Sequence, residues 1–186
     1  ATKASVYPDN KVNNMACGVL TVGGTPQIYC VGGNASQVVG NASRVFSYDP
    51  MTDTFTTLTA ADNWPGSVGG TFIPGGFAVA GNKLYIIGSF NGNTTPGAVS
   101  AQTWQFDPNA APGSRWLQRA DYPVARGYVP AASIGGLIYT AGGSIPDPVA
   151  ALDTALALFE LYQANPHGTA SLVPDDAAFL SECFRS

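Results

Sequence analysis

The sequence predicts an all-β protein built from repeats, and three recurring features support this. An Asp-Pro or Asn-Pro dipeptide recurs at an interval of 58 residues, at Asp49-Pro50, Asp107-Pro108 and Asn165-Pro166. An aromatic residue stands three positions before each dipeptide, at Phe46, Trp104 and Tyr162. Well upstream of each lies a strand-like segment that ends in small residues, at 28–33, 84–89 and 138–143. A period of about 50 residues with four strand-like segments is typical of one β-propeller blade.

The composition agrees with many tight turns and few long helices. The 186 residues include 22 Gly and 14 Pro, and 45% of them are hydrophobic, which argues against disorder. Charged residues make up only 11%, and the net charge is −4. No basic stripe is available for phosphate, so nucleic acid is excluded as an expected partner. No apolar run is long enough to predict a membrane span.

In the first repeat, we expect strands at 16–22 and 27–31, joined by a primed turn at Gly23-Gly24. This register places Cys17 opposite Cys30. Two interpretations stay open for the pair: a cross-strand disulfide, which would imply an oxidising compartment, or two buried free thiols. Further strands are expected at 43–48 and 54–58, around a turn begun by Asp49-Pro50.

The second repeat follows the same scheme. Strands are expected at 71–80 and 83–88, joined by a turn at Gly81-Asn82. The third and fourth strands are expected at 102–106 and 115–118, on either side of a turn that Asp107 begins.

The third repeat is degenerate, and its local signals conflict. Asp147-Pro148 reads as the start of a short helix over about 148–163, because Asp is a good N-cap and Pro is favoured at the first helical position. The repeat pattern instead requires a strand at about 158–162. Both alternatives stay open, since helix propensity is often overridden by tertiary context.

With these elements the chain resembles Kelch-repeat proteins. The motifs that carry the resemblance are Tyr29-Cys30-Val31-Gly32-Gly33, Tyr48-Asp49-Pro50 and Pro123-Val124-Ala125-Arg126-Gly127. The resemblance covers about residues 8–172 and implies a β-propeller of four-stranded antiparallel blades. The blades would span about 8–62, 65–120 and 123–172, followed by a tail at 173–186. The second repeat departs from the family pattern with Ser89 in place of the second Gly.

Three blades are too few to close a ring, which needs at least about four. An open set would expose sheet faces and unpaired edges. We therefore expect self-association or pairing with another propeller segment, so that a second chain or further sequence completes the ring.

Catalytic constellations are hard to find in the sequence. His167 is the one histidine and lies in a turn-like segment beside Pro166. One histidine cannot supply the copper-radical site of some Kelch propellers, and the three cysteines lack zinc-ligand spacing. No cofactor, no metal site and no catalytic residue is expected, so the chain is not predicted to be an enzyme.

The expected function is an extracellular or cell-surface binding or assembly module. Trp64, Phe90 and Asn91 are the candidate binding residues for a carbohydrate or protein ligand, although for Trp64 the favoured alternative is packing beneath the next blade. Asn-x-Ser/Thr triplets mark candidate glycosylation sites at Asn34, Asn41 and Asn93. The alternative function is the non-catalytic propeller part of a secreted enzyme, carbohydrate-active or oxidase-like, whose active site is supplied elsewhere.

Overall fold

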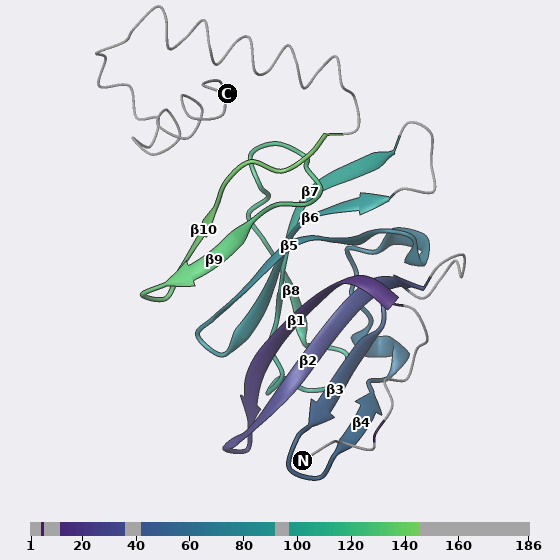
Figure 1. The fold of residues 1–186 in the computed structure, drawn as a ribbon, viewed down its shortest axis with the longest axis vertical. Coiled ribbons are helices and arrows are strands. Elements are labelled where there is room, and N and C mark those ends of the chain that lie inside the picture. Colours follow the sequence, from purple (N-terminus) through teal and green to yellow (C-terminus); the bar gives the residue numbers. More distant parts are fainter. Residues whose placement is uncertain (1–4, 6–11, 36–41, 92–96, 146–186) are drawn as a thin grey trace, which may run out of the picture. The chain divides into compact units, whose positions relative to one another are not determined.

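The computed structural model describes residues 5, 12–35, 42–91 and 97–145 (Figure 1). They contain ten β-strands in antiparallel sheets and two single-turn 3₁₀ helices, η1 (Ala60–Asp62) and η2 (Val68–Gly70). The prediction of an all-β fold is confirmed for this part of the chain. The described residues belong to one compact unit, Ala1–Pro146. The helix or strand expected within 148–163, the end of the third repeat and the tail at 173–186 all lie outside the described residues.

The first sheet has four antiparallel strands in sequence order. They are β1 (Val12–Val22), β2 (Thr25–Ala35), β3 (Val45–Asp49) and β4 (Thr54–Thr57). The turn between β1 and β2 is Gly23-Gly24, with φ of 56° and 83°, values that glycine adopts without steric cost. This turn sets the register that pairs Cys17 with Cys30, and the two form a disulfide with Cα atoms 4.2 Å apart. The disulfide prediction is confirmed.

The second sheet repeats the first. Its strands, again in sequence order, are β5 (Ile73–Ala80), β6 (Lys83–Asn91), β7 (Ala98–Phe106) and β8 (Trp116–Arg119). The predicted turn at Gly81-Asn82 is confirmed, with φ of 54° and 58°. The expected end of the second strand at residue 88 is wrong, since β6 continues through Gly88 to Asn91. Gly88 has φ of 63° at an irregularity in the register between β6 and β7. Beyond this irregularity, the last three residues of β6 pair with Ala98, Val99 and Ser100 of β7.

The third repeat contributes one hairpin to the described part of the chain. Its strands β9 (Ala131–Ile134) and β10 (Leu137–Thr140) flank a turn at Gly135-Gly136 with φ of 60° and 81°. The expected strand at 138–143 ends at Thr140, after which Gly127 and Ser144 form an isolated antiparallel bridge. No helix within the described ranges is long and apolar enough to cross a membrane.

The predicted turns at Asp49-Pro50 and Asp107-Pro108 are held by the aspartate side chains. Oδ1 of Asp49 accepts a hydrogen bond from the backbone N–H of Met51 at 2.8 Å. Oδ1 of Asp107 accepts from the N–H of Asn109 at 3.0 Å. The same local chemistry therefore closes the β3–β4 and β7–β8 connections.

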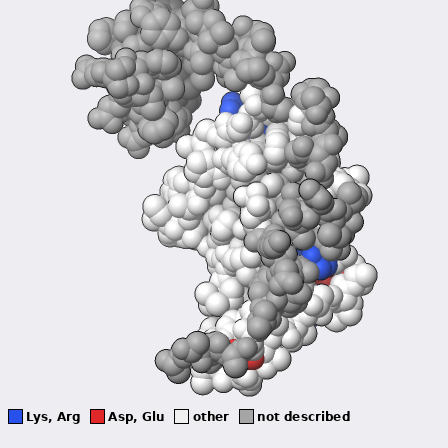
Figure 2. All heavy atoms as spheres, turned by 45° about the vertical axis from the view of Figure 1, so that its right-hand side comes forward, with Lys and Arg blue, Asp and Glu red and all other residues white. Residues whose placement is uncertain are grey.

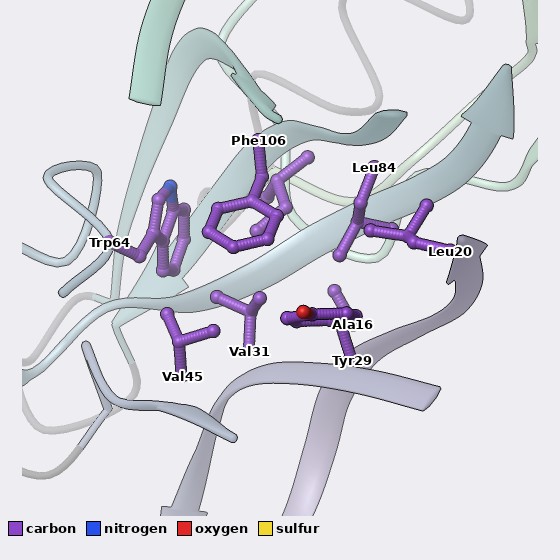
Figure 3. Packing of buried hydrophobic residues seen from close by; sticks show 9 residues of the cluster. Ala16, Leu20, Tyr29, Val31, Val45, Trp64, Leu84 and Phe106 are labelled. Atoms are coloured by element: carbon purple, nitrogen blue, oxygen red, sulfur yellow. The ribbon is translucent and has the colours of Figure 1, made fainter. Parts of the chain in front are cut away.

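The main core lies between the first two sheets (Figure 3). Its buried members are Ala16, Leu20, Tyr29, Val31, Val45, Trp64, Leu84, Ile86 and Phe106. The rings of Tyr29 and Phe106 meet across the sheets with centroids 5.5 Å apart. Trp64, from the connection between the sheets, is 1% exposed. The assignment of Trp64 as a ligand-binding residue is therefore wrong, because its indole is buried in the core where a ligand cannot reach it. The alternative, that Trp64 packs between the repeats, agrees with this burial.

The hairpin of the third repeat is held to the second sheet by backbone contacts at glycines. The N–H of Val129 donates to the carbonyl oxygen of Gly75 at 2.8 Å. A Cβ atom added at Gly76 would overlap the carbonyl oxygen of Val129, and one added at Gly88 would overlap that of Arg126. The close approach of the two backbones therefore requires glycine at both positions.

Candidate binding cleft

The three repeats place equivalent residues near the start of their first strands, and in the third repeat these residues come just before the strand. The shared tyrosine of the repeat motif occurs at Tyr29, Tyr85 and Tyr139, each on the second strand of its hairpin. Their partners on the first strands are Gly18, Ala78 and Ala132. Counting back from these partners makes Asn14, Pro74 and Tyr128 equivalent, and likewise Met15, Gly75 and Val129.

These equivalent positions line one cleft of about 410 Å³. Its lining residues are Asn14 and Met15 from the first repeat, Pro74, Gly75, Gly76 and Phe77 from the second, and Tyr128, Val129, Pro130 and Ala131 from the third. β1 lies beside β5, and β5 lies beside β9 (Figure 1). The cleft is therefore built by the first strands of three successive repeats and the segment that leads into the third.

Two residues of the cleft have a backbone conformation that L-residues seldom adopt. Asn14 has φ of 56° and Tyr128 has φ of 50°. Asparagine tolerates this region, whereas for a bulky residue such as tyrosine it is uncommon and costs about 1–3 kcal/mol. The strain at Tyr128 persists because the flanking residues are fixed: Gly127 pairs with Ser144, and Val129 bonds to Gly75.

The accessible side chains of the cleft are aromatic and uncharged. Phe77 is 39% exposed and Tyr128 is 51% exposed. The Tyr128 ring is supported from behind by Phe90, with centroids 5.1 Å apart. Asn14 adds an exposed amide, and none of the described residues that line the cleft is Lys, Arg, Asp or Glu. On the face shown in Figure 2, charged residues are few and scattered. This arrangement favours neutral ligands that have an apolar face.

The structure places the other predicted binding residues beside this cleft, at the end of β6. Phe90 supports Tyr128 but does not line the cleft. Asn91 is 7% exposed, and its Nδ2 donates to Oγ1 of Thr71 at 3.1 Å. Both residues belong to β6 rather than to the loop that follows it. Sequence reasoning missed Asn14, Phe77 and Tyr128, which alignment of the three tyrosine motifs could have brought together.

A second cleft of about 310 Å³ lies where the two sheets meet. Asp62, which is 1% exposed, lines it together with Arg115. The carboxylate of Asp62 accepts from Arg115 Nη1 at 2.8 Å, from the N–H of Gly113 at 2.8 Å and from Thr59 Oγ1 at 3.3 Å. Burial raises the pKa of nearby Tyr29, and the charge of Arg115 partly opposes that shift. Because the Asp62 carboxylate already has these three donors, we assign it to holding the sheets together.

Only some of the remaining predicted sites lie within the described residues. Asn34 lies near the end of β2, opposite Asn13, whereas Asn41 and Asn93 lie outside the described residues, as do His167 and Cys183. Within the described ranges, no three His, Cys, Asp or Glu side chains lie close enough to hold a metal ion.

Comparison with known proteins adds information on the fold. No family model matches the sequence, and no curated protein matches it. The chain is similar to a solved structure described as "Structure of YjhT", with a TM-score of 0.53 and 12% sequence identity. The similarity covers 76% of this chain and 41% of that one, so this chain spans less than half of the matched protein. At this identity the similarity indicates a shared fold and nothing further.

Proposed function

We propose that this chain is a segment of a Kelch-like β-propeller and works as a binding and assembly module without catalytic residues of its own. The observation that carries the proposal is the cleft lined by equivalent positions of three repeats, on their first strands or just before them. In a propeller the blades stand around a central channel. The cleft would then be part of the channel wall.

The hairpin β9–β10 supports the assembly part of this proposal. Ile134 is 69% exposed and Leu137 is 62% exposed. In the first two sheets the second strand pairs with a third strand, whereas β10 pairs only with β9 among the described residues. The similarity to 41% of a longer chain agrees with a ring that needs more than these residues. We propose that further blades, from a second copy or from additional sequence, cover this hairpin.

An extracellular or cell-surface location belongs to the same proposal. The Cys17–Cys30 disulfide supports it, because disulfides persist in oxidising compartments. The triplets at Asn34, Asn41 and Asn93 add acceptors for N-linked glycans. Mass analysis of the secreted protein before and after glycosidase treatment tests this part, and unchanged mass in a eukaryotic host would contradict the glycan assignment.

Sedimentation velocity of the native chain over micromolar concentrations tests the assembly. We expect species larger than the monomer, and we expect the double variant Ile134→Ser/Leu137→Ser to shift them towards monomer. Val68→Ser is the matched control, since Val68 is similarly exposed but lies on η2, away from the hairpin. A compact monomer with native β-sheet circular dichroism at all concentrations would contradict the proposal.

A further inference from the structure

We infer that the candidate cleft binds a neutral saccharide, with Phe77 and Tyr128 as the stacking surface and Asn14 as a hydrogen-bonding group. This inference rests on the proposed binding function and specifies its ligand. It follows from the exposed aromatic side chains of the cleft, from the uncharged character of its described lining residues and from its size.

Phe77 and Tyr128 are exposed aromatic side chains of the same cleft, and their backbones are held in place. Phe77 extends from β5, where its backbone pairs with Ile86. Tyr128 is fixed on one side by Phe90 and on the other by the hydrogen bond from Val129 to Gly75. A rigid, exposed aromatic face loses little conformational entropy on binding. The face of a sugar ring that carries only C–H groups suits it, because those hydrogens are weakly positive and the aromatic face is negative.

The polar groups of the cleft fit hydroxyls better than ions. The Asn14 amide can donate and accept, and the Tyr128 hydroxyl can do the same. An ionic ligand would lose hydration without gaining a counter-charge from any described lining residue. Neutral hydroxyl groups lose less on leaving water and can bond to both side chains.

The size of the cleft agrees with a small ligand. Its volume of about 410 Å³ falls in the range of small-molecule sites, which is about 300–1,000 Å³. A proline-rich peptide also stacks on aromatic rings, but it is recognised along an extended groove. The aromatic and size criteria together favour a saccharide over a peptide.

Saturation-transfer difference NMR on the native chain tests the inference, with maltose, cellobiose and lactose as separate probes. We expect at least one disaccharide to receive saturation, concentrated on the protons of one ring face. Sorbitol, a flexible polyol without a ring face, is the ligand control and should receive none. Absence of transfer to all three disaccharides, or equal transfer to sorbitol, would overturn the inference.

Three variants test whether the disaccharide binds in the cleft. Phe77→Val keeps a strand-forming residue, Tyr128→Asn suits the positive φ, and Asn14→Gly keeps the backbone conformation while removing the amide. We expect Phe77→Val and Tyr128→Asn each to weaken binding by about fivefold to tenfold, and Asn14→Gly by about fivefold. Tyr139→Ala removes an equally exposed aromatic from β10, outside the cleft, and should bind normally.

The binding and sedimentation experiments together distinguish a failure of this inference from a failure of the proposed function. Unchanged affinity in all three cleft variants would place the sugar elsewhere and overturn the inference. Absence of binding in a chain that still associates would overturn the ligand assignment alone. Cleft-dependent binding in a chain that stays monomeric would leave the saccharide site standing and remove the assembly proposal.

Discussion

Cys17 and Cys30 face each other because two glycines with positive φ make the turn between their strands. The disulfide closes a short loop, with a sequence separation of 13. Cross-links of this size stabilise mainly by restricting the unfolded chain. The disulfide therefore adds to the stability of the first hairpin without changing its register.

Replacing both cysteines, as Cys17→Ser/Cys30→Ser, should lower the free energy of unfolding by about 2–3 kcal/mol. Urea unfolding followed by circular dichroism measures the change. Cys183→Ser leaves this disulfide in place and serves as the control. A double variant as stable as the parent chain would show that the hairpin does not depend on the cross-link.

The carboxylate of Asp107 gives the protein a pH-dependent contact. A hydrogen bond from Lys83 Nζ lowers the pKa of Asp107 below its ordinary value of 3.8, burial opposes that shift, and the N–H of Asn109 assists it. Because the pKa of Asp107 is lower in the folded state, its ionised carboxylate stabilises the fold at pH values above the ordinary pKa. The contribution is lost as the pH falls through the folded-state pKa.

Asp107→Asn should therefore reduce stability at neutral pH and have little effect at a pH below the folded-state pKa of Asp107. The loss should be less than about 1 kcal/mol, because the ion pair is partly exposed to solvent. Urea unfolding of parent and variant at neutral and strongly acidic pH provides the comparison. An equal difference at both pH values would mean that the ion pair does not set the pH dependence.

At the scale of elements, the connection from β4 to β5 anchors the second sheet to the first. Asp62 of this connection holds Arg115 and Gly113, and the indole N–H of Trp116 donates to the Asp62 carbonyl oxygen at 2.7 Å. The corresponding aspartate after β8 is Asp121. It is exposed and accepts from Gln118 Nε2 at 3.3 Å.

Asp62→Ala should lower the free energy of unfolding by about 3 kcal/mol, because it leaves the Arg115 charge half-buried without its partner. Asp121→Ala, the matched control, should change it by less than about 0.5 kcal/mol. Thermal and urea unfolding of both variants give the two values. Similar losses in the two variants would contradict the anchoring role of Asp62.

Gly76 controls how the β9–β10 hairpin is held to the second sheet. Gly76→Ala should push the Val129 carbonyl away and weaken the Val129–Gly75 hydrogen bond, so amides of β9 and β10 should exchange faster with solvent. Hydrogen exchange read by mass spectrometry gives the local rates. Gly69→Ala strains a positive φ in open space and should leave these rates unchanged. Unaltered exchange in Gly76→Ala would mean that other contacts hold the hairpin.

At the scale of the molecule, assembly through the hairpin should depend on apolar burial rather than on charge. Only 11% of the residues are charged, and the hairpin strands β9 and β10 carry none. Association should therefore be nearly unchanged between about 0.05 M and 0.5 M NaCl, where the Debye length shortens severalfold. Sedimentation equilibrium at both salt concentrations checks this. A strong decrease in association at the higher NaCl concentration would indicate ionic contacts instead.

The parts of the fold that follow from short-range chemistry could be predicted from the sequence. The Gly-Gly and Gly-Asn turns and the Asp-Pro turns depend on residues within a few positions of one another. The pairing of Cys17 with Cys30 follows from the turn between them. The length of β6 could not be predicted in this way, because Gly88 suggests an end, yet its positive φ lets the strand continue after a register irregularity.

By itself, the sequence determined the repeat, the antiparallel hairpins and the pairing of Cys17 with Cys30, since each is set by local backbone preferences. Only the tertiary structure decided which aromatic residues are buried and which are accessible. Trp64 is in the core because Gly66 leaves room for its ring between the sheets, whereas Phe77 and Tyr128 lie open in one cleft. Burial depends on how separate repeats pack, and that packing joins residues more than 50 positions apart in the sequence.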